Sequence, residues 1–545
     1  MNLAASGHNQ AAGGDEMADQ QPELVRDLSR PAAYGGRVRQ VDFRATHASW
    51  VFLTETEVFK VKRPVDLGFL DYRTLEDRRR ACLAEVRLNR RLAPDVYLGV
   101  VPVHRDDGGH TLAGDGPPVD WAVHMRRLPV GASAAARLAA GTLDAPSLEK
   151  VARRLASFLS EAATTPTFGA LSTLAANVDE NFAQTRPLLG DLVPAPTFAE
   201  VEAFQRDMLA RHGDRFQARI AANRIREGHG DVRLEHIYFL GDGPPVIIDA
   251  IEFNDRFRCG DAAGEIAFLA MELEAARRLD LADGLIARFA EESDDFDLYR
   301  VLDFYLSYRA WVRGKVAAFV ATDPATPAER RRSKEDEARR CFGLARSATG
   351  LPLDRPFLIA VGGLIASGKS TLAEQLGRVL AAPVVSSDRT RKARAGLAPT
   401  EQASASVYEL GARQEIYGEI LQRAGHVLQS GRGALVDASF ASRRWRADAA
   451  AAARAAGATF VFVEARAPLD VLRARLAARR TRDSVSDARE DLLDAFVRDY
   501  EPVVGAEGQV TLTIDTATTG EDAARAALGG LTAAGILPAA ERRRS

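Results

Sequence analysis

The chain has 545 residues, of which 46% are hydrophobic and 27% are charged, and its formal net charge is −3. This length favours about three or four domain-sized units, and the composition is ordinary for a globular protein. The balanced charge gives no basic field that would attract nucleic acid, and no stretch approaches the run of about 18 apolar residues that a membrane span needs. The three cysteines show neither disulfide nor zinc spacing, and the first residues lack the pattern of a signal peptide, so we expect a cytoplasmic protein.

Hydrophobic periodicity predicts a strand-rich region in the first quarter of the chain. Residues 1–23 are rich in Gly, Ala and Gln without any period, and are predicted to be a disordered tail. Alternating residues at 50–53 and 58–62, around a Thr-Glu-Thr-Glu turn, predict two antiparallel strands, and 119–125 predicts a further strand. Between them, residues 73–92 have the spacing of a helix with a basic outer face.

The next region is predicted to be mostly helical. Its helical pattern extends from 143 to 315 and is interrupted by two strands, at 237–240 and 246–249. A small strand-rich lobe followed by a larger helical lobe is the order of a two-lobed kinase, so we expect a kinase-like domain over 24–320. Residues 321–354 combine a charge-rich run with flanking Pro and Gly and are predicted to be a linker, although the charged middle could form a solvated helix.

The C-terminal part has the alternating pattern of a parallel sheet. Buried strands are separated by helical segments over 355–540, which implies βαβ units. The strands are predicted at 357–361, 383–386, 434–437, 459–463 and 510–514.

A phosphate-binding loop follows the first of these strands. The sequence from Gly363 to Ser370 fits the P-loop pattern G-x-x-x-x-G-K-(S/T), and a helix is predicted from Lys369 to Leu380. Backbone N–H groups of a glycine turn can surround phosphate oxygens, and the positive end of the next helix faces the same oxygens. Lys369 is expected to reach the β- and γ-phosphates of ATP, and Ser370 to hold Mg²⁺. The nucleotide-binding residues are predicted to be Gly363, Leu364, Ile365, Ala366, Ser367, Gly368, Lys369, Ser370 and Thr371.

The predicted fold class is therefore α/β and α+β. It consists of a two-lobed protein-kinase-like domain followed by a P-loop NTPase domain with a parallel sheet.

Two acidic residues follow later strands of this sheet. Asp388 lies after the second strand, where it could face the γ-phosphate and take a proton from an acceptor hydroxyl. Arg391 would share its helical face and steady an anionic acceptor; alternatively, Asp388 is a helix N-cap and Arg391 its ion-pair partner. Asp437 ends a buried strand and is either a metal-side acid or an exposed strand-end cap.

Arginines further along could form a lid. Arg475 and Arg479 are spaced i, i+4 and could close over the transferring phosphates, or they could belong to a solvated helix face. The P-loop, the Asp388–Arg391 pair and this Arg-rich segment before Ser-Asp-Ala-Arg resemble the kinases that include gluconate kinase, chloramphenicol phosphotransferase, zeta toxin and the 5′-kinase domain of polynucleotide kinases. The likeness covers about 355–540 and implies ATP-dependent phosphorylation of a hydroxyl group.

A second phosphate-handling signature lies upstream. His229-Gly-Asp231, followed by Asp249 at the end of a later strand, resembles the catalytic loop and metal-binding aspartate of the aminoglycoside phosphotransferase family. The resemblance covers about 25–320. It implies that Asp231 accepts the proton of the substrate hydroxyl and that Asp249 coordinates Mg²⁺.

The same resemblance implies a lysine at the α- and β-phosphates, paired with Glu85. Lys60 and Lys62 share the parity of one strand, so alternation leaves both open, with a slight preference for Lys60. The chain departs from the family at His236, where an Asn is expected, and imidazole is a poorer Mg²⁺ ligand than oxygen. It also lacks the glycine-rich loop, since residues 46–49 occupy the turn between the strands.

Two features of the N-terminal half bear on its acceptor. The acidic stretch 291–297 could line a pocket for a polycation such as an aminoglycoside, but its position between helices favours a solvated surface run. Arg309 and Arg313 lie one turn apart in an apolar helix, and buried arginines need partners, which could be internal carboxylates or an anionic substrate. We therefore do not expect an antibiotic to be the natural acceptor.

These patterns predict an ATP-dependent phosphotransferase with two fused kinase-type modules, similar to the bacterial proteins described as bifunctional aminoglycoside phosphotransferase/ATP-binding proteins. The C-terminal module is expected to phosphorylate a hydroxyl of a small molecule, with ATP and Mg²⁺ as cofactors. Two alternatives stay open. The N-terminal module could be a non-catalytic binding module that regulates the P-loop module, or it could restrain a toxin-like kinase of nucleotide sugars.

Overall fold

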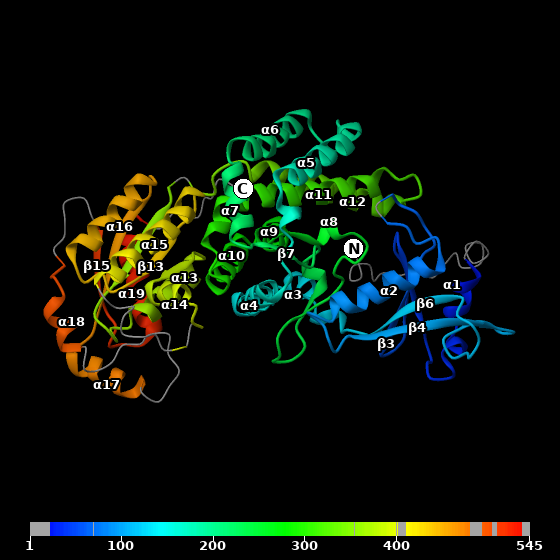
Figure 1. Cartoon of the computed structure of the whole chain (residues 1–545), viewed down its shortest axis with the longest axis horizontal. Coiled ribbons are helices and arrows are strands. Elements are labelled where there is room, and N and C mark those ends of the chain that lie inside the picture. The colour runs from blue at the N-terminus through cyan, green and yellow to red at the C-terminus, as the bar shows by residue number, and fades with distance from the viewer. Residues whose placement is uncertain are drawn as a thin grey trace. The chain divides into compact units, whose positions relative to one another are not determined.

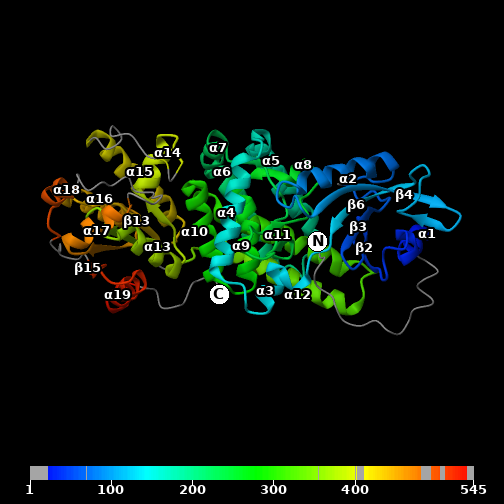
Figure 2. The ribbon, with the colours of Figure 1, turned by 90° about the horizontal axis from the view of Figure 1, so that it is seen from below.

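The computed structural model describes residues 22–68, 70–353, 355–398, 401, 410–479, 493–503 and 510–536. The chain divides into two compact units, the first formed by residues 1–169 and 223–272 and the second by 170–222 and 273–545. Figure 1 and Figure 2 show the helices and strands of these units. No helix in the described parts of the chain is long and apolar enough to cross a membrane.

The first unit begins with a six-stranded antiparallel sheet. The strand order is β1-β2-β3-β6-β4-β5. The strands are β1 (Asp42–Ala45), β2 (Ser49–Leu53), β3 (Glu57–Lys62), β4 (Tyr97–Asp106), β5 (Gly109–Thr111) and β6 (Asp120–Arg126). Phe52 of β2 pairs with Phe59 of β3, which confirms the predicted hairpin. β1, β4 and β5 were not predicted from the sequence.

Helices cover both faces of this sheet. Helix α2 (Leu75–Asn89) packs on one face around Cys82, and it lies along β6 and β4 in Figure 1. Helix α1 (Glu23–Leu28) and the short helix η2 (Pro31–Tyr34) cover the other face. Because side chains alternate along β3, Phe59 and Val61 enter the α1 core, whereas Lys60 and Lys62 reach the α2 side.

The rest of the first unit carries the segment that resembles a kinase catalytic loop. Its helices are η3 (Val130–Ala132), α3 (Ala134–Ala139), α4 (Ala145–Glu161), η4 (Pro166–Gly169), η6 (Leu234–His236), α8 (Asp255–Arg258) and α9 (Ala262–Ala275). Its strands are β7 (Ile225–Glu227), β8 (Ile237–Tyr238), β9 (Val246–Ile247) and β10 (Cys259–Asp261), and they form the antiparallel pairs β8–β9 and β7–β10. The two predicted strands are present but shorter than expected.

Helices form the first part of the second unit. They are α5 (Leu171–Thr185), η5 (Arg186–Leu188), α6 (Ala195–Arg211), α7 (Gly213–Ala221), α10 (Leu279–Ser293), η7 (Phe296–Arg300), α11 (Leu302–Thr322) and α12 (Ala328–Ser347). Most of the predicted linker is therefore the ordered helix α12, which packs on α11. The ring of Phe342 lies 4.8 Å from that of Trp311. The segment is rich in charge because α12 buries only a narrow stripe.

A five-stranded sheet forms the C-terminal part of the second unit. The strand order is β12-β13-β11-β14-β15, and every neighbouring pair is parallel, as predicted. The strands are β11 (Phe357–Gly362), β12 (Val384–Ser386), β13 (Ala434–Asp437), β14 (Thr459–Arg466) and β15 (Val510–Asp515). The helices are α13 (Lys369–Leu380), α14 (Ser387–Arg394), α15 (Leu410–Gln429), α16 (Arg443–Ala455), α17 (Leu469–Arg479), α18 (Leu493–Asp499) and α19 (Gly520–Ala533).

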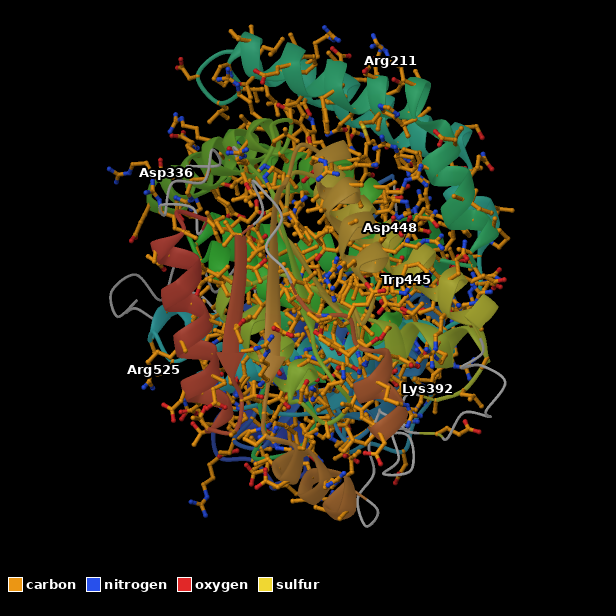
Figure 3. All side chains as sticks on the ribbon, turned by 90° about the vertical axis from the view of Figure 1, so that its left-hand side faces the viewer. Arg211, Asp336, Lys392, Trp445, Asp448 and Arg525 are labelled. Atoms are coloured by element: carbon orange, nitrogen blue, oxygen red, sulfur yellow. The ribbon has the colours of Figure 1, made fainter. Side chains whose placement is uncertain are left out.

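These helices cover the parallel sheet on both faces. Helices α13 and α19 share one core with Ile359 and Val463 of the inner strands. Helices α15 and α16 contact the other face. Figure 3 shows Arg525 of α19 and Trp445 of α16 on opposite sides of the strands. This doubly covered parallel sheet, together with the antiparallel sheet of the first unit, confirms the predicted fold class.

Candidate functional site

The P-loop joins the central strand of the parallel sheet to α13. Because β11 lies between β13 and β14, the loop opens at the carboxyl edge where the chain crosses from one side of the sheet to the other. Gly363 has a φ of 146°, and a Cβ there would lie 2.4 Å from the carbonyl oxygen of Ala465. Gly368 has a φ of 85° and caps the start of α13 at Lys369. Only glycine fits these two positions, so the backbone N–H groups can approach an anion closely.

The apolar residues of the loop are held by the helices that follow β14. Ile365 and Ala366 are buried in one cluster with α17 and α18, and Leu364 packs against it. The carbonyl oxygen of Ser367 accepts a hydrogen bond from the hydroxyl of Thr516, which follows β15. The side chains of residues 364–366 therefore hold the loop in place by packing, and Ser367 does so through its backbone carbonyl.

A pocket of about 300 Å³ lies beside the loop. It is lined by Ala366, Gly368, Thr371, Leu372, Arg475, Ala478, Thr516, Thr518, Gly520 and Ala523. Arg475 donates hydrogen bonds to the carbonyl oxygens of Ala366, at 3.3 Å, and Thr516. The pocket residues after β15 were not predicted from the sequence, where their only signal was a small, polar run at a strand end. Arg479 ends α17, but its side chain and the predicted segment 484–489 lie outside the described residues.

Asp437 ends β13 beside the start of α13, and it is buried rather than an exposed cap. Burial and the nearby Asp388 carboxylate raise its pKa to about 6, although Lys369 and a hydrogen bond with Ser370 lower it. Its Oδ1 atom has no hydrogen-bond partner among the described residues. A buried carboxylate oxygen without a partner, next to a serine hydroxyl, fits the oxygen donors that Mg²⁺ prefers.

Asp388 and Arg391 lie in the first turns of α14, at the end of the edge strand β12. The Arg391 guanidinium forms an ion pair with Asp388. The structure thus shows the ion pair of the alternative interpretation, although Ser386 and not Asp388 is the N-cap of α14. It also places Asp388 close enough to Asp437 to affect its pKa. The two carboxylates and Lys369 therefore belong to one electrostatic cluster at the carboxyl edge of the sheet.

The first unit contains a second such cluster, around β3 and α2. Lys60 Nζ lies 2.9 Å from Glu85 Oε1 and 2.8 Å from Asp249 Oδ1. Lys62 Nζ contacts the other oxygen of Glu85, at 2.5 Å, and also Glu252. Lys60 is therefore the lysine that contacts Asp249. Lys62 instead links Glu85 to Glu252, three residues after Asp249.

The charges in this cluster stabilise one another. Burial alone would lower the pKa of Lys60, but the carboxylates of Asp249 and Glu85 raise it well above its usual value. Burial would raise the pKa of Asp249, but Lys60 and His236 hold it well below its usual range. Asp249 also has a φ of 67°, which non-glycine residues rarely adopt and which is typical of functional sites.

The catalytic-loop segment is fixed by buried hydrogen bonds. Burial and the nearby His236 lower the pKa of His229 to about 4, so its ring is neutral; its Nε2–H donates to the carbonyl of Ile248 at 2.9 Å. The carboxylate of Glu265 accepts hydrogen bonds from the backbone N–H groups of His229 and Gly230, at 3.0 and 2.8 Å. Glu265 was not predicted from the sequence; it lies in the Gly-Asp-Ala-Ala-Gly-Glu run of residues 260–265, in the first turn of α9.

His236 lies between Asp231, the predicted catalytic residue, and Asp249, the predicted metal ligand. Its Nδ1 is 2.9 Å from the carbonyl oxygen of Asp231, and its Nε2 is 3.6 Å from Asp249 Oδ2. Because a carbonyl can only accept, Nδ1 carries a proton and Nε2 is the nitrogen that faces Asp249. This donor set of one imidazole and one carboxylate fits Mg²⁺ less well than all-oxygen ligands would.

The structure shows what the arginine of α11 and the acidic stretch, the two features considered for acceptor binding, contact. Arg313 pairs with Glu337 of α12, so an internal carboxylate binds it. The acidic stretch 291–297 is not a solvated run, because its carboxylates pair with Arg389, Arg423 and His426. A run of acids looks the same in the sequence whether water or arginine neutralises it.

The chain is similar to known proteins both over its P-loop part and over most of its length. A family model described as an AAA domain matches residues 358–503. A protein of Mycobacterium tuberculosis and one of Mycobacterium bovis, each described as uncharacterized, are 32% identical over 448 residues, covering 81% of this chain and 86% of theirs. The chain belongs to the family of these mycobacterial proteins. The match to the AAA domain model confirms the predicted P-loop domain of this chain.

Several solved structures are similar to parts of this chain. A gluconokinase from Sinorhizobium meliloti is 22% identical, covers 33% of this chain and 94% of its own, and has a TM-score of 0.25. The APS kinase of Mycobacterium tuberculosis, in complex with AMPPNP and APS, is 20% identical over 33% of this chain and 98% of its own, with a TM-score of 0.25. A GDP complex of an aminoglycoside 2′-phosphotransferase is 15% identical over 59% of this chain and 100% of its own, with a TM-score of 0.34.

Proposed function

We propose that this protein is an ATP-dependent phosphotransferase of the cytoplasm with two fused kinase-type modules. The C-terminal module, residues 355–540, would phosphorylate a hydroxyl group of a small molecule. The observation that supports this most strongly is the cluster at the P-loop. There Asp437 is buried beside Ser370 and Lys369, and its Oδ1 has no hydrogen-bond partner in the part of the chain that the structure describes. A buried carboxylate would repel a bound phosphate unless a cation such as Mg²⁺ lay between them, so its presence favours a site for a metal–nucleotide complex.

In the C-terminal module, different residues would bind the phosphates, hold the metal ion and accept the proton. The backbone N–H groups of the P-loop and Lys369 bind the phosphates, and Ser370 and Asp437 would hold Mg²⁺, which would neutralise phosphate charge. Asp388 accepts the proton of the acceptor hydroxyl as the new oxygen–phosphorus bond forms and the bond to ADP breaks. Arg391 orients Asp388. Arg475 and Arg479 would close over the phosphates.

The N-terminal module, residues 24–320, would carry out the same class of reaction. Asp231 would accept the proton of an acceptor hydroxyl and Asp249 would hold the metal ion. Lys60 would contact the α- and β-phosphates, with Glu85 holding it in place. Small molecules are the expected partners of both modules, and nucleic acid is not.

A second candidate function is supported by His236. Its imidazole stands where the related kinases use an oxygen ligand, so the N-terminal module could bind nucleotide without transferring phosphate and regulate the P-loop module. This alternative predicts that all phosphoryl transfer depends on the C-terminal residues alone.

The test is phosphoryl transfer by the full-length chain. ATP labelled with ³²P at its γ-phosphate is incubated with the protein and a pooled metabolite extract, and labelled products are separated. We expect one product to be lost with Asp388→Asn, by about 10²- to 10⁴-fold in rate, and another with Asp231→Asn. Asp448→Asn, on the outer surface of α16 (Figure 3), is the matched control and should leave both unchanged.

The outcome separates the proposals. If Asp231→Asn changes no product, the N-terminal module is the regulatory one of the second candidate. If the unmodified chain yields only free phosphate, the C-terminal module is an ATPase and the proposed hydroxyl kinase is wrong.

A further inference from the structure

The acidic stretch belongs to a longer strip of paired carboxylates. Residues 291–303, here called the docking segment, run from the last turn of α10 through η7 into α11. Four of its carboxylates contact the C-terminal module. Three form ion pairs with arginines, Glu292 with Arg389, Asp294 with Arg423 and Asp303 with Arg432, and Asp297 lies 2.7 Å from His426 Nδ1. Four partners spread over one short strip indicate a built contact surface rather than isolated surface pairs.

Two of these contacts fix helix α14. The Arg389 guanidinium donates to the backbone carbonyl of Glu291 at 3.0 Å. Arg423, which is bound to Asp294 at 3.0 Å, donates to the hydroxyl of Thr390 at 3.2 Å. Adjacent residues of α14 are therefore held by the docking segment, one directly and one through Arg423.

The strand that leads into α14 is held as well. Glu291 Oε1 accepts a hydrogen bond from the backbone N–H of Val384, the first residue of β12, at 2.8 Å. Burial raises the pKa of Glu291 to about 7, although Arg288 and Arg389 lower it. The contact is therefore largely closed to water, where hydrogen bonds to backbone groups are stronger.

The other side of α14 carries the candidate chemistry. At 100° per residue, positions 388 and 391 lie on one side of a helix and positions 389 and 390 on the opposite side. Asp388 and Arg391 pair with each other on the Asp437 side, and Arg389 and Thr390 are held by the docking segment. A shift of the docking segment would therefore move Asp388.

We propose that the docking segment is a positioning element for phosphoryl transfer at the P-loop, in which Arg389 and Asp294 fix α14 and so the place of Asp388 relative to Lys369. The proposal rests on the proposed function for the reaction that is positioned. Arg389 and Asp294 are positioning residues, because they act on the reaction through α14.

The test uses Arg389→Gln and Asp294→Asn in the full-length chain. Asparagine keeps the left-handed backbone of position 294, which has a φ of 49°. We expect amide hydrogen exchange of 388–394 to be about tenfold faster or more. We expect formation of the product that depends on Asp388 to fall ~10- to 100-fold, with unchanged affinity for a non-hydrolysable ATP analogue. Arg389→Lys, which keeps the charge, should recover part of the rate.

Arg525→Gln is the matched control. Arg525 is an exposed arginine of α19 that pairs with Asp522 of the same helix, so exchange of α14 and the rate should stay as in the unmodified chain. The proposal is overturned if exchange of α14 is unchanged in Arg389→Gln, or if exchange rises while the product forms at the same rate. Absence of any product from the unmodified chain would count against the proposed function instead, and exchange alone would then decide whether the docking segment fixes α14.

Discussion

Asp249 and Asp437 are both buried acids at the ends of strands, but their surroundings differ. Lys60 lies 2.8 Å from Asp249, so this carboxylate is already neutralised by a cation of the chain. Asp437 forms no ion pair with the described residues, and burial and Asp388 raise its pKa to about 6 although Lys369 lowers it. A carboxylate whose charge is poorly compensated gains most from an added cation. The C-terminal site is therefore the better prepared of the two for a metal ion.

Nucleotide binding by the C-terminal module should weaken on acidification because of Asp437. Its pKa is raised above the usual value, so below about pH 6 the empty site holds a proton that Mg²⁺ must displace. We expect the affinity for Mg²⁺ with an ATP analogue to fall by up to about tenfold per pH unit there. Because nucleotide phosphate also titrates in this range, the measurement compares the unmodified chain with Asp437→Asn. Parallel pH curves for the two proteins would contradict the prediction.

The metal preference of the N-terminal module should depend on His236. Imidazole favours later transition metals over Mg²⁺, and carboxamide oxygen does not. We expect His236→Asn to lower the ratio of Co²⁺ to Mg²⁺ affinity by about tenfold, because Nε2 faces Asp249. Calorimetric titration in the Lys369→Ala background, with the visible absorption of Co²⁺ as a second readout, measures this ratio. An unchanged ratio and spectrum would show that His236 does not bind the metal, which favours the regulatory alternative.

At the scale of elements, the two helices that precede the P-loop domain are packed through one small residue. A Cβ on Gly314 of α11 would lie 2.8 Å from the ring of Phe342 on α12. That ring is buried against Trp311 and has no room to move away. The close approach of α11 and α12 therefore requires glycine at this position.

Gly314→Ala should accordingly destabilise the protein by ~1–3 kcal/mol through overpacking, less whatever alanine gains in helix propensity. Gly343→Ala on α12 is the matched control, since a Cβ there meets nothing within 4 Å. It should stabilise the helix by up to about 1 kcal/mol. Urea unfolding followed by circular dichroism gives both shifts in midpoint. Stabilisation by both substitutions would show that the two helices can separate to admit the methyl group.

At the scale of the whole molecule, the chain carries two clusters that each combine a lysine with carboxylates, one in each compact unit. We expect each module to bind one nucleotide. Calorimetric titration with an ATP analogue should give about two sites for the unmodified chain and about one for Lys369→Ala. Lys150→Ala, at an exposed position of α4, is the control. Complete loss of binding in Lys369→Ala would show that the N-terminal module does not bind nucleotide.

Local chemistry made part of this protein predictable from its sequence. The P-loop is contiguous, so its glycines, lysine and serine fall into place once β11 and α13 form. The parallel strands followed from apolar runs separated by helical patterns. Strand parity placed Lys60 and Lys62 on the side of Glu85, because alternation is a property of the strand alone.

Tertiary packing decided the rest. Which lysine meets Asp249 depends on where the segment after β9 crosses the sheet, and parity is the same for both. The acidic stretch was expected to be solvated but forms part of the docking segment, because charge density does not reveal what a charge faces. The charged middle of the predicted linker is the helix α12, which the sequence had left as one of two possibilities. The sequence by itself thus determined motifs and periodicities, which depend on neighbouring residues. Only the tertiary structure decided which distant side chains pair, because those contacts are set by how whole elements pack.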